Sequence, residues 1–133
     1  MAGATLVKKL MMKPGMTGFI MNAPAGYRET LGQLPESIKI GDRPEGTADW
    51  AQVFVKTKPE VRDNVPGVLK ALKNDGILWL SYPKGTSKVP TELNRDILWG
   101  MMKEYGLEGV AMVSIDDTWS AMRFRPAEQV SRR

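Results

Sequence analysis

The chain has 133 residues, of which 42% are hydrophobic and 26% are charged, a mixture typical of a single globular domain over residues 1–133. It contains neither cysteine nor histidine. That composition excludes disulfides, thiolate or imidazole metal sites, and acid–base catalysis by histidine. No apolar run approaches the roughly 20 residues that a membrane helix needs. We therefore expect a cytoplasmic protein with no metal site and no membrane contact.

The formal net charge is +4, and the positive excess lies at the two ends of the chain. Residues 1–13 include three lysines and no acid, and residues 123–133 include four arginines and one glutamate. Basic chain ends mainly aid solubility, and no nucleic-acid recognition motif accompanies them. The sequence thus predicts no specific nucleic-acid partner, and a basic, flexible tail from about residue 127.

Hydrophobic periodicity and turn residues define the elements of the first half of the chain. In chain order we expect a helix over residues 5–13, a strand over 16–22, a short helix over 27–34, a strand over 37–40, a loop over 41–47 and a strand over 50–55. Pro14-Gly15 ends the first helix. Residues 23–26 form the turn between the first strand and the second helix.

The second half continues the alternation of helices and strands. We expect a helix over residues 58–73 that ends at Asn74-Asp75-Gly76, a strand over 77–82, a loop over 83–90, a helix from an N-cap at Thr91 to Gly106, and strands over 109–115 and 118–125. The tight connection Asp116-Asp117 implies an antiparallel hairpin. Pro66 either kinks the helix over 58–73 or starts a second helix after Asn64.

Strands that alternate with helices indicate a mostly parallel sheet, and right-handed crossovers place helices on both of its faces. The C-terminal hairpin must introduce an antiparallel strand at one edge of this sheet. The predicted fold is therefore α/β: a three-layer sandwich with a mostly parallel sheet and a C-terminal antiparallel hairpin.

The order strand, helix, strand, helix and antiparallel hairpin resembles the second half of the class I methyltransferase fold. Residues 72–78 are similar to the sequence that leads into the last parallel strand of that fold. Residues 48–55 are similar to the strand before it, and Asp49 matches the Asp that usually introduces that strand. On this mapping, residues 19–22 are the first strand. One helix–strand unit is missing between Ile40 and Asp49, so the resemblance implies a truncated methyltransferase-like Rossmann fold.

From about residue 10 to residue 126, the chain also resembles a family of short bacterial proteins of unknown function. The matching phrases are Asn22-Ala23-Pro24-Ala25-Gly26-Tyr27, Leu78-Trp79, Tyr82-Pro83-Lys84, Thr91-Glu92-Leu93-Asn94-Arg95-Asp96 and Ile115-Asp116-Asp117-Thr118-Trp119-Ser120-Ala121-Met122-Arg123-Phe124. This second resemblance implies a small methyltransferase-like Rossmann fold and no established reaction.

The carboxyl ends of the predicted parallel strands form the candidate site, because ligands bind there in open parallel sheets. These ends carry residues 22–28, 56–58 and 81–88, whose basic side chains suit a small anionic ligand such as a phosphate, a nucleotide or a carboxylate. The candidate ligand-binding residues are Asn22 and Gly26 in the turn, Tyr27 and Tyr82 as walls, and Arg28, Lys84 and Lys88 as anion contacts. Helix N-termini after these loops would add partial positive charge. No catalytic residue is assigned.

The resemblance also raises S-adenosylmethionine as a cofactor. Methyltransferases bind it with a glycine-rich turn after the first strand and an acidic residue that ends the second. The turn in this chain has the single glycine Gly26, together with Pro24, which removes an amide donor. The acid after Ile40 is Asp42, displaced by one residue. Both departures weaken the prediction of this cofactor.

Three further features have plainer interpretations. The loop from Lys84 to Lys88 lacks the spacing of a P-loop and is interpreted as a lid or a solvated loop. Asp116-Asp117 is interpreted as a turn rather than a pair of catalytic carboxylates. Trp79 and Trp119 are expected in the core.

Taken together, the residues favour a small anionic-ligand or nucleotide-binding module without catalysis over an enzyme. Two alternatives stay open. One is an S-adenosylmethionine-dependent methyltransferase whose backbone turn at residues 23–26 holds the cofactor. The other is a non-enzymatic protein that forms homo-oligomers and fills its crevice with its own side chains. Polar loops that bind nothing would give the same sequence pattern.

Overall fold

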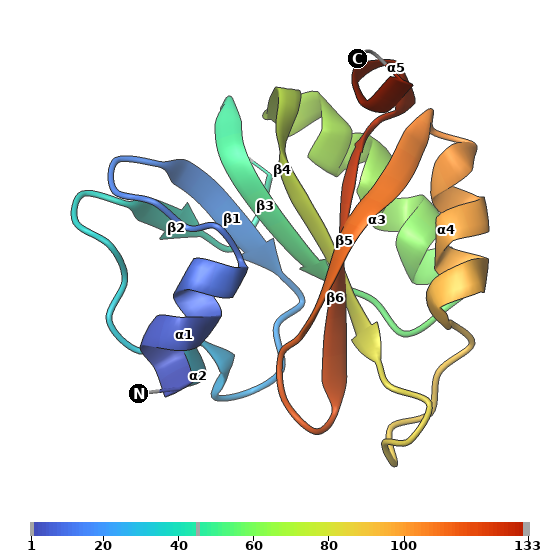
Figure 1. Ribbon diagram of the computed structural model, residues 1–133, viewed down its shortest axis with the longest axis horizontal. Coiled ribbons are helices and arrows are strands. Elements are labelled where there is room, and N and C mark those ends of the chain that lie inside the picture. Colours follow the sequence, from blue (N-terminus) through green and yellow to red (C-terminus); the bar gives the residue numbers. More distant parts are fainter. Residues whose placement is uncertain (1, 45, 132–133) are drawn as a thin grey trace.

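The computed structural model describes residues 2–44 and 46–131. Its elements in chain order, labelled in Figure 1, are α1 (Ala2–Lys9), β1 (Thr17–Met21), α2 (Tyr27–Leu31), β2 (Lys39–Gly41), β3 (Ala48–Phe54), α3 (Lys58–Ala71), β4 (Leu72–Pro83), α4 (Arg95–Lys103), β5 (Leu107–Ser114), β6 (Trp119–Pro126) and α5 (Ala127–Ser131). The predicted flexible tail from residue 127 thus begins as the short helix α5, while residues 132–133 lie outside the described residues.

The strands form one six-stranded sheet in the order β2-β1-β3-β4-β6-β5. The pairs β1–β2, β1–β3 and β3–β4 are parallel, and β6 lies antiparallel between β4 and β5. Among the described residues, β2 is an edge strand with no further strand beside it. A loop leads from Gly41 directly to β3. The predicted mostly parallel sheet, the antiparallel hairpin and the missing helix–strand unit are confirmed.

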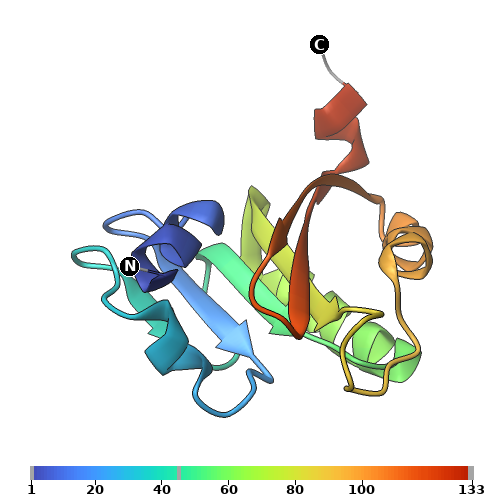
Figure 2. The ribbon, with the colours of Figure 1, turned by 60° about the horizontal axis from the view of Figure 1, so that its bottom comes forward.

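Helices cover both faces of the sheet, and each face has its own apolar core (Figures 1 and 2). α1 and α2 pack at the β2–β1 end, with a core that includes Leu6, Leu10, Tyr27, Leu31, Trp50, Phe54, Trp79 and Trp119. α3 and α4 cover the opposite face, with a core that includes Phe19, Val61, Val65, Val68, Leu80, Tyr82, Leu98 and Met102. Alternate residues of each strand enter opposite cores, as the two-residue period of a strand requires. The three-layer sandwich and the core positions of the two tryptophans are confirmed.

α1 ends before the predicted boundary at residue 13. Its last residue is Lys9, and the carbonyl oxygen of Leu10 accepts hydrogen bonds from the indole Nε1 of Trp50 at 2.7 Å and of Trp79 at 2.9 Å. Met11 then adopts a left-handed conformation with φ of 64°. Two tryptophans from the central strands therefore fix the end of α1, a tertiary interaction that no local signal near Pro14 reports.

β4 begins earlier than predicted. The helix α3 ends at Ala71 and β4 starts at Leu72, so the predicted helix end after residue 73 and the strand start at residue 77 were wrong. Leu72 pairs with Ala48 across the parallel ladder, and the next pair, Trp50 with Ile77, follows a register shift that spans the extension.

α3 is a single helix, which decides between the two interpretations of Pro66. The helix runs over Lys58–Ala71 with Pro66 inside it. Proline leaves the carbonyl oxygen of Arg62, four residues earlier, without its usual amide donor. Pro66 and Arg62 are both exposed, so water can take the place of the missing donor.

The N-cap of α4 is Asn94 and not Thr91. The Asn94 side chain accepts a hydrogen bond from the amide of Ile97 at 2.8 Å. Thr91 instead donates its hydroxyl to the carbonyl oxygen of Lys56 at 2.8 Å. Both side chains are good caps, and the second contact, 35 residues away in sequence, determines which of them starts the helix.

The predicted C-terminal antiparallel hairpin is confirmed. β5 and β6 pair antiparallel, and the carboxylate Oδ1 of Asp116 accepts hydrogen bonds from the amides of Thr118 and Trp119, both at 2.8 Å. Asp116 thus acts as a turn residue. α4 ends at Lys103 with Glu104 as its C-cap, so Gly106, predicted as the C′ residue, lies beyond the end of the helix. Gly106, with φ of 75°, closes the turn that follows, and its amide donates to the carbonyl oxygen of Lys103 at 2.9 Å.

Asp49 gives the fold a pH-dependent contact. Its carboxylate accepts a hydrogen bond from Lys73 Nζ at 2.6 Å and from the amide of Thr17 at 3.0 Å, and these two bonds hold the pKa of Asp49 below its usual value. A lowered folded-state pKa adds stability above the unfolded pKa, and this stability is lost as the pH falls through the folded value.

We therefore expect Asp49→Asn to lower the free energy of unfolding at pH 7 by at most about 1 kcal/mol, as is usual for an exposed pair. The difference from the wild type should shrink as the pH falls below the ordinary aspartate pKa of about 4, because the lowered folded-state pKa of Asp49 lies beneath that value. Urea titrations of both proteins at pH 7 and pH 3 measure it. A difference that is equal at the two pH values would contradict this role of the carboxylate.

Candidate functional site

The strand order places a topological switch point between β1 and β3. From β1, the chain crosses to β2 on one side and later to β3 on the other, and ligands bind at the carboxyl ends of the strands at such a point. A cavity of about 290 Å³ lies there, lined by Asn22, Ala23, Pro24, Phe54, Lys56, Glu60 and Trp119. Its volume is at the lower end of the range of about 300–1,000 Å³ for small-molecule sites.

The turn from β1 to α2 forms one wall of this cavity. Asn22 and Gly26 have φ of 59° and 82°, and the amide of Tyr27 donates to the carbonyl oxygen of Pro24 at 3.1 Å. No atom lies within 4 Å of a Cβ at Gly26, so conformation, rather than space, requires glycine at this position. The predicted strand-to-helix turn is therefore in place, and its residues 22–24 line the cavity.

The N-terminus of α3 forms the opposite wall. Glu60 Oε1 accepts from the amides of Lys56 at 2.6 Å and Thr57 at 3.2 Å, and the Thr57 hydroxyl accepts from the Glu60 amide. The amide of Lys58 donates to Glu92 Oε1 at 2.8 Å. These amides already have carboxylate or hydroxyl partners from the chain itself. The expectation that helix N-termini would offer donors to an anion is therefore not met at α3.

Aromatic rings line the floor of the cavity. Phe54 packs edge-to-face against Tyr27, with ring centroids 4.7 Å apart, and against Trp119 at 5.0 Å. The Tyr27 hydroxyl donates to Gln52 Oε1 at 2.8 Å, and Gln52 Nε2 donates to Ser81 Oγ at 2.9 Å. Gln52 and Ser81 are fully buried. Burial raises the pKa of Tyr27 far above its usual value, so its hydroxyl stays protonated and donates at neutral pH.

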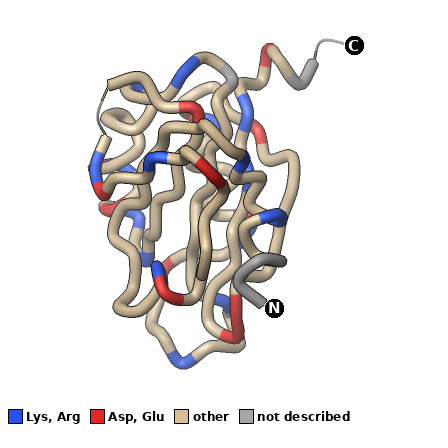
Figure 3. The backbone as a smooth tube through the Cα atoms, turned by 90° about the vertical axis from the view of Figure 1, so that its left-hand side faces the viewer, with Lys and Arg blue, Asp and Glu red and all other residues tan. Residues whose placement is uncertain are grey.

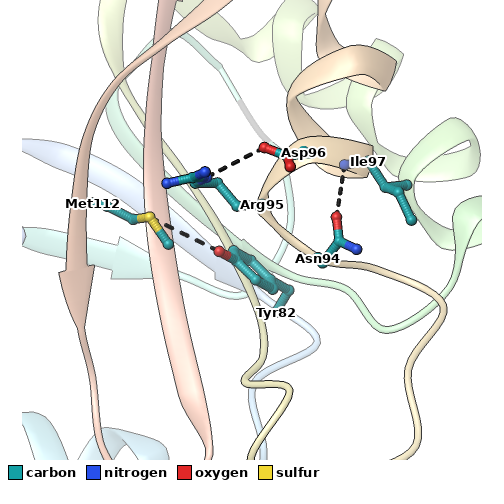
Figure 4. Close-up of polar contacts among 6 residues, drawn as sticks. All are labelled: Tyr82, Asn94, Arg95, Asp96, Ile97 and Met112. Carbon is teal, nitrogen blue, oxygen red and sulfur yellow. Dashed lines mark hydrogen bonds and ion pairs between the residues drawn. The ribbon is translucent and has the colours of Figure 1, made fainter.

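The two tyrosines do not form the walls of one crevice, so that prediction was wrong. Tyr27 belongs to the core under α2, and Tyr82 to the core under α4, on the opposite face of the sheet. Both rings are 4% exposed. Figure 4 shows the Tyr82 hydroxyl near Met112, whose Sδ lies 4.0 Å away, beside the N-terminus of α4. Burial raises the pKa of Tyr82.

The three predicted anion contacts do not converge either. Arg28 donates to the carbonyl oxygens of Ile40 at 3.1 Å and Gly41 at 2.9 Å, at the end of β2. Lys84 Nζ donates to Ser114 Oγ at 2.7 Å, and Lys88 is exposed on the loop after β4. None of the three lines the cavity. Main-chain carbonyl oxygens hold Arg28 and the Ser114 hydroxyl holds Lys84, and any role of these residues in ligand binding stays a prediction.

Basic and acidic residues alternate over the side of the molecule drawn in Figure 3. The acid after β2 follows this pattern: Asp42 lies 3.9 Å from Arg43, and both side chains are at least 78% exposed. Asp42 is not among the residues that line the cavity. Among the described residues, the acid after β2 is therefore not directed at the candidate site, in keeping with the displacement expected from the sequence.

Sequence reasoning missed three residues of the cavity, Phe54, Glu60 and Trp119. Glu60 could have been found, because Thr57 and Glu60 have the spacing of a capping box, which predicts a helix N-terminus at the carboxyl edge of the sheet. Trp119 was expected to be entirely structural. It is 9% exposed, and the exposed part of the ring reaches the cavity.

The described residues contain neither an acidic cluster suited to a metal ion nor a helix suited to span a membrane. No group of three or more acidic side chains there gathers closely enough to hold a metal ion. No helix in the same residues has the length and apolar character to cross a membrane.

Solved structures with the same arrangement are methyltransferases. The chain is 15% identical to the N-methyltransferase NodS from Bradyrhizobium japonicum WM9, covering 93% of each chain with a TM-score of 0.59. It is 13% identical to a SAM-dependent methyltransferase from Aquifex aeolicus, covering 92% of this chain and 88% of that chain with a TM-score of 0.62. It is 14% identical to phosphoethanolamine N-methyltransferase 2 of Haemonchus contortus, solved with S-adenosyl-L-methionine, covering 94% and 37% with a TM-score of 0.57.

At these identities the likeness concerns the fold, and it places the chain in the class of Rossmann-like folds found in class I SAM-dependent methyltransferases. The resemblance seen in the sequence is confirmed at this level. No protein-family model and no curated protein sequence matches the chain.

Proposed function

We propose that the chain binds S-adenosylmethionine in the cavity between the ends of β1 and β3 and is a methyltransferase. The observation that carries the proposal is the position of the cavity, at the switch point of a sheet whose structural neighbours are SAM-dependent methyltransferases. A non-catalytic site for anions has less support, because Arg28, Lys84 and Lys88 lie outside this cavity.

The residues present fit the cofactor in part. The turn after β1 places Asn22, in a left-handed conformation, and Pro24 against the cavity. The cation of Lys56 and the carboxylate of Glu60 suit the two charges of an amino-acid group. Among the described residues, no acid other than Glu60 lines the cavity to bind the ribose hydroxyls, and Pro24 cannot donate an amide. We therefore expect binding in the micromolar range or weaker, at or above about −8 kcal/mol.

When bound, the cofactor supplies an electrophilic methyl group on a positively charged sulfur. The contribution of the chain is to orient the acceptor and to exclude water. With no histidine or cysteine, Glu60 is the ionisable base that lines the cavity, and it is held by the amides of Lys56 and Thr57. This arrangement suits a methyl acceptor whose attacking atom already has a free lone pair, so that no proton has to be removed first.

Calorimetric titration with S-adenosylmethionine and S-adenosylhomocysteine, with ATP as an anionic control, tests the binding. Ala23→Trp places a large ring in the cavity from an exposed position. We expect it to weaken both adenosyl ligands at least about tenfold, a change of about 1.4 kcal/mol. The matched control is Lys70→Ala, an exposed residue of α3 outside the cavity lining, which should change the affinity less than twofold. The double lysine variant Lys84→Ala with Lys88→Ala removes two of the predicted anion contacts and tests the anion-binding alternative.

Two results would contradict the proposal. If the folded wild type binds neither S-adenosylmethionine nor S-adenosylhomocysteine, the proposed function is wrong. Binding of ATP alone that is lost in the double lysine variant would instead support the anion-binding module. Chromatographic measurement of S-adenosylhomocysteine formed with small amine, phenol and carboxylate acceptors then separates turnover from binding, and a bound but unconverted cofactor would restrict the function to binding.

A further inference from the structure

The segment between β4 and α4, residues 84–92, is tied to the molecule at both ends; we call it the strap. At its first end, the amide of Lys84 donates to the carbonyl oxygen of Thr118 at 2.7 Å, and Lys84 Nζ donates to Ser114 Oγ at 2.7 Å. Thr118 is adjacent to Trp119, which lines the cavity. The first anchor of the strap therefore holds one wall of the candidate site.

The second anchor holds the opposite wall. The carbonyl oxygen of Lys56, a cavity residue, accepts hydrogen bonds from the Thr91 hydroxyl at 2.8 Å and from the Glu92 amide at 2.9 Å. Glu92 Oε1 also accepts from the amide of Lys58 at 2.8 Å. The side chain of Glu92 thus accepts a hydrogen bond from the amide of Lys58, the first residue of α3, beside the cavity.

The middle of the strap has no comparable attachment. Its hydrogen bonds stay within the strap: Ser87 bonds back to the carbonyl oxygen of Lys84 through its amide at 3.0 Å and its hydroxyl at 2.8 Å. No residue from 84 to 92 is buried. Local opening therefore exposes no core and breaks few hydrogen bonds, which places this segment among the least stable parts of the fold. In Figure 1 it extends from the same lower edge as the carboxyl ends of β1 and β3.

We propose that the strap is a gate over the cavity, latched by Glu92, and that a ligand in the cavity favours the closed position. The inference rests on the proposed function, because the ligand is of the S-adenosylmethionine class. A ligand that contacts both the Lys56 wall and the Trp119 wall fixes both attachment points, and it therefore binds the closed form better than the open one. Glu92 is a positioning residue, since it acts through Lys56 and Lys58.

Limited trypsin digestion followed by mass spectrometry measures opening, since cleavage after Lys88 follows the population of the open strap. Cleavage after Lys39, which is exposed in the edge strand β2, is the internal reference. Without ligand, Glu92→Gln should raise the rate after Lys88 about fivefold, as expected when a charge-assisted bond becomes a neutral one, and leave the rate after Lys39 unchanged. Glu104→Gln, the same chemical change at the C-cap of α4, should leave both rates as in the wild type.

Saturating S-adenosylhomocysteine should slow cleavage of the wild type after Lys88 several-fold, and less so in Glu92→Gln. Equal rates for Glu92→Gln and wild type without ligand overturn the latch. An unchanged rate after Lys88 when calorimetry shows bound S-adenosylhomocysteine overturns the gate. If calorimetry shows no binding, the proposed function fails, and the ligand-free comparison alone then decides whether Glu92 latches the strap.

Discussion

Gly18→Ala is expected to lower the free energy of unfolding by about 3 kcal/mol or more, the upper range for inserting a group into a packed interior. A Cβ at this position would lie 2.3 Å from the carbonyl oxygen of Trp50. Gly18 pairs with Trp50 in the parallel ladder between β1 and β3. The obstructing atom belongs to the backbone, so β1 and β3 must separate to relieve the steric clash. These two strands also form the floor of the candidate site.

The matched control is Gly67→Ala. Gly67 lies on the exposed side of α3, and no atom approaches within 4 Å of a Cβ there. This substitution should stabilise the protein by about 0.5–1 kcal/mol, because glycine in a helix interior loses more chain entropy than alanine. Urea denaturation of the three proteins gives both values. A Gly18→Ala variant as stable as the wild type would show that β1 and β3 are not paired in this register.

Gln52→Leu is the second large effect, with an expected loss of about 3 kcal/mol. The substitution nearly conserves volume but removes both partners of a buried chain of hydrogen bonds. The Tyr27 hydroxyl loses its acceptor, and Ser81 Oγ loses its donor. Each orphaned buried group costs about 1–3 kcal/mol. The network lies directly under the cavity, so the same variant should also weaken any ligand bound there.

The triple variant Tyr27→Phe, Gln52→Leu, Ser81→Ala is the control for this prediction. It removes all three polar groups together, so no buried donor or acceptor is left without a partner, and most of the lost stability should return. Thermal and urea denaturation measure the recovery. If the triple variant is less stable than Gln52→Leu alone, packing, rather than hydrogen bonding, explains the role of Gln52.

Several features of the fold could be predicted because their signals are local. Asp116 sits in a turn between two apolar strands, and its carboxylate bonds amides two and three residues away. Gly106 closes the turn after α4, where its positive φ suits glycine. Alternation of helical and strand patterns over longer stretches was sufficient to predict a parallel sheet with helices on both faces. The order of these elements also carried the resemblance to the methyltransferase fold.

The candidate site could be predicted only as a region. The turn around Asn22 and Gly26 was found because parallel strands bring their carboxyl ends to one edge. The sequence pattern gave no means to decide between Lys56, which lines the cavity, and Lys84, which bonds Ser114. That choice depends on a hydrogen bond between residues 30 positions apart.

By itself, the sequence determined the class of fold, the hairpin and the edge of the sheet at which a ligand would bind, because periodicity, caps and turns act within a few residues. Only the tertiary structure decided where α1 ends, where β4 begins and on which face each tyrosine lies. The carbonyl of Leu10 and the indole of Trp79, for example, are 69 residues apart. Such partners are chosen by the register of the sheet, since a shift of one residue moves every side chain of a strand to the other face.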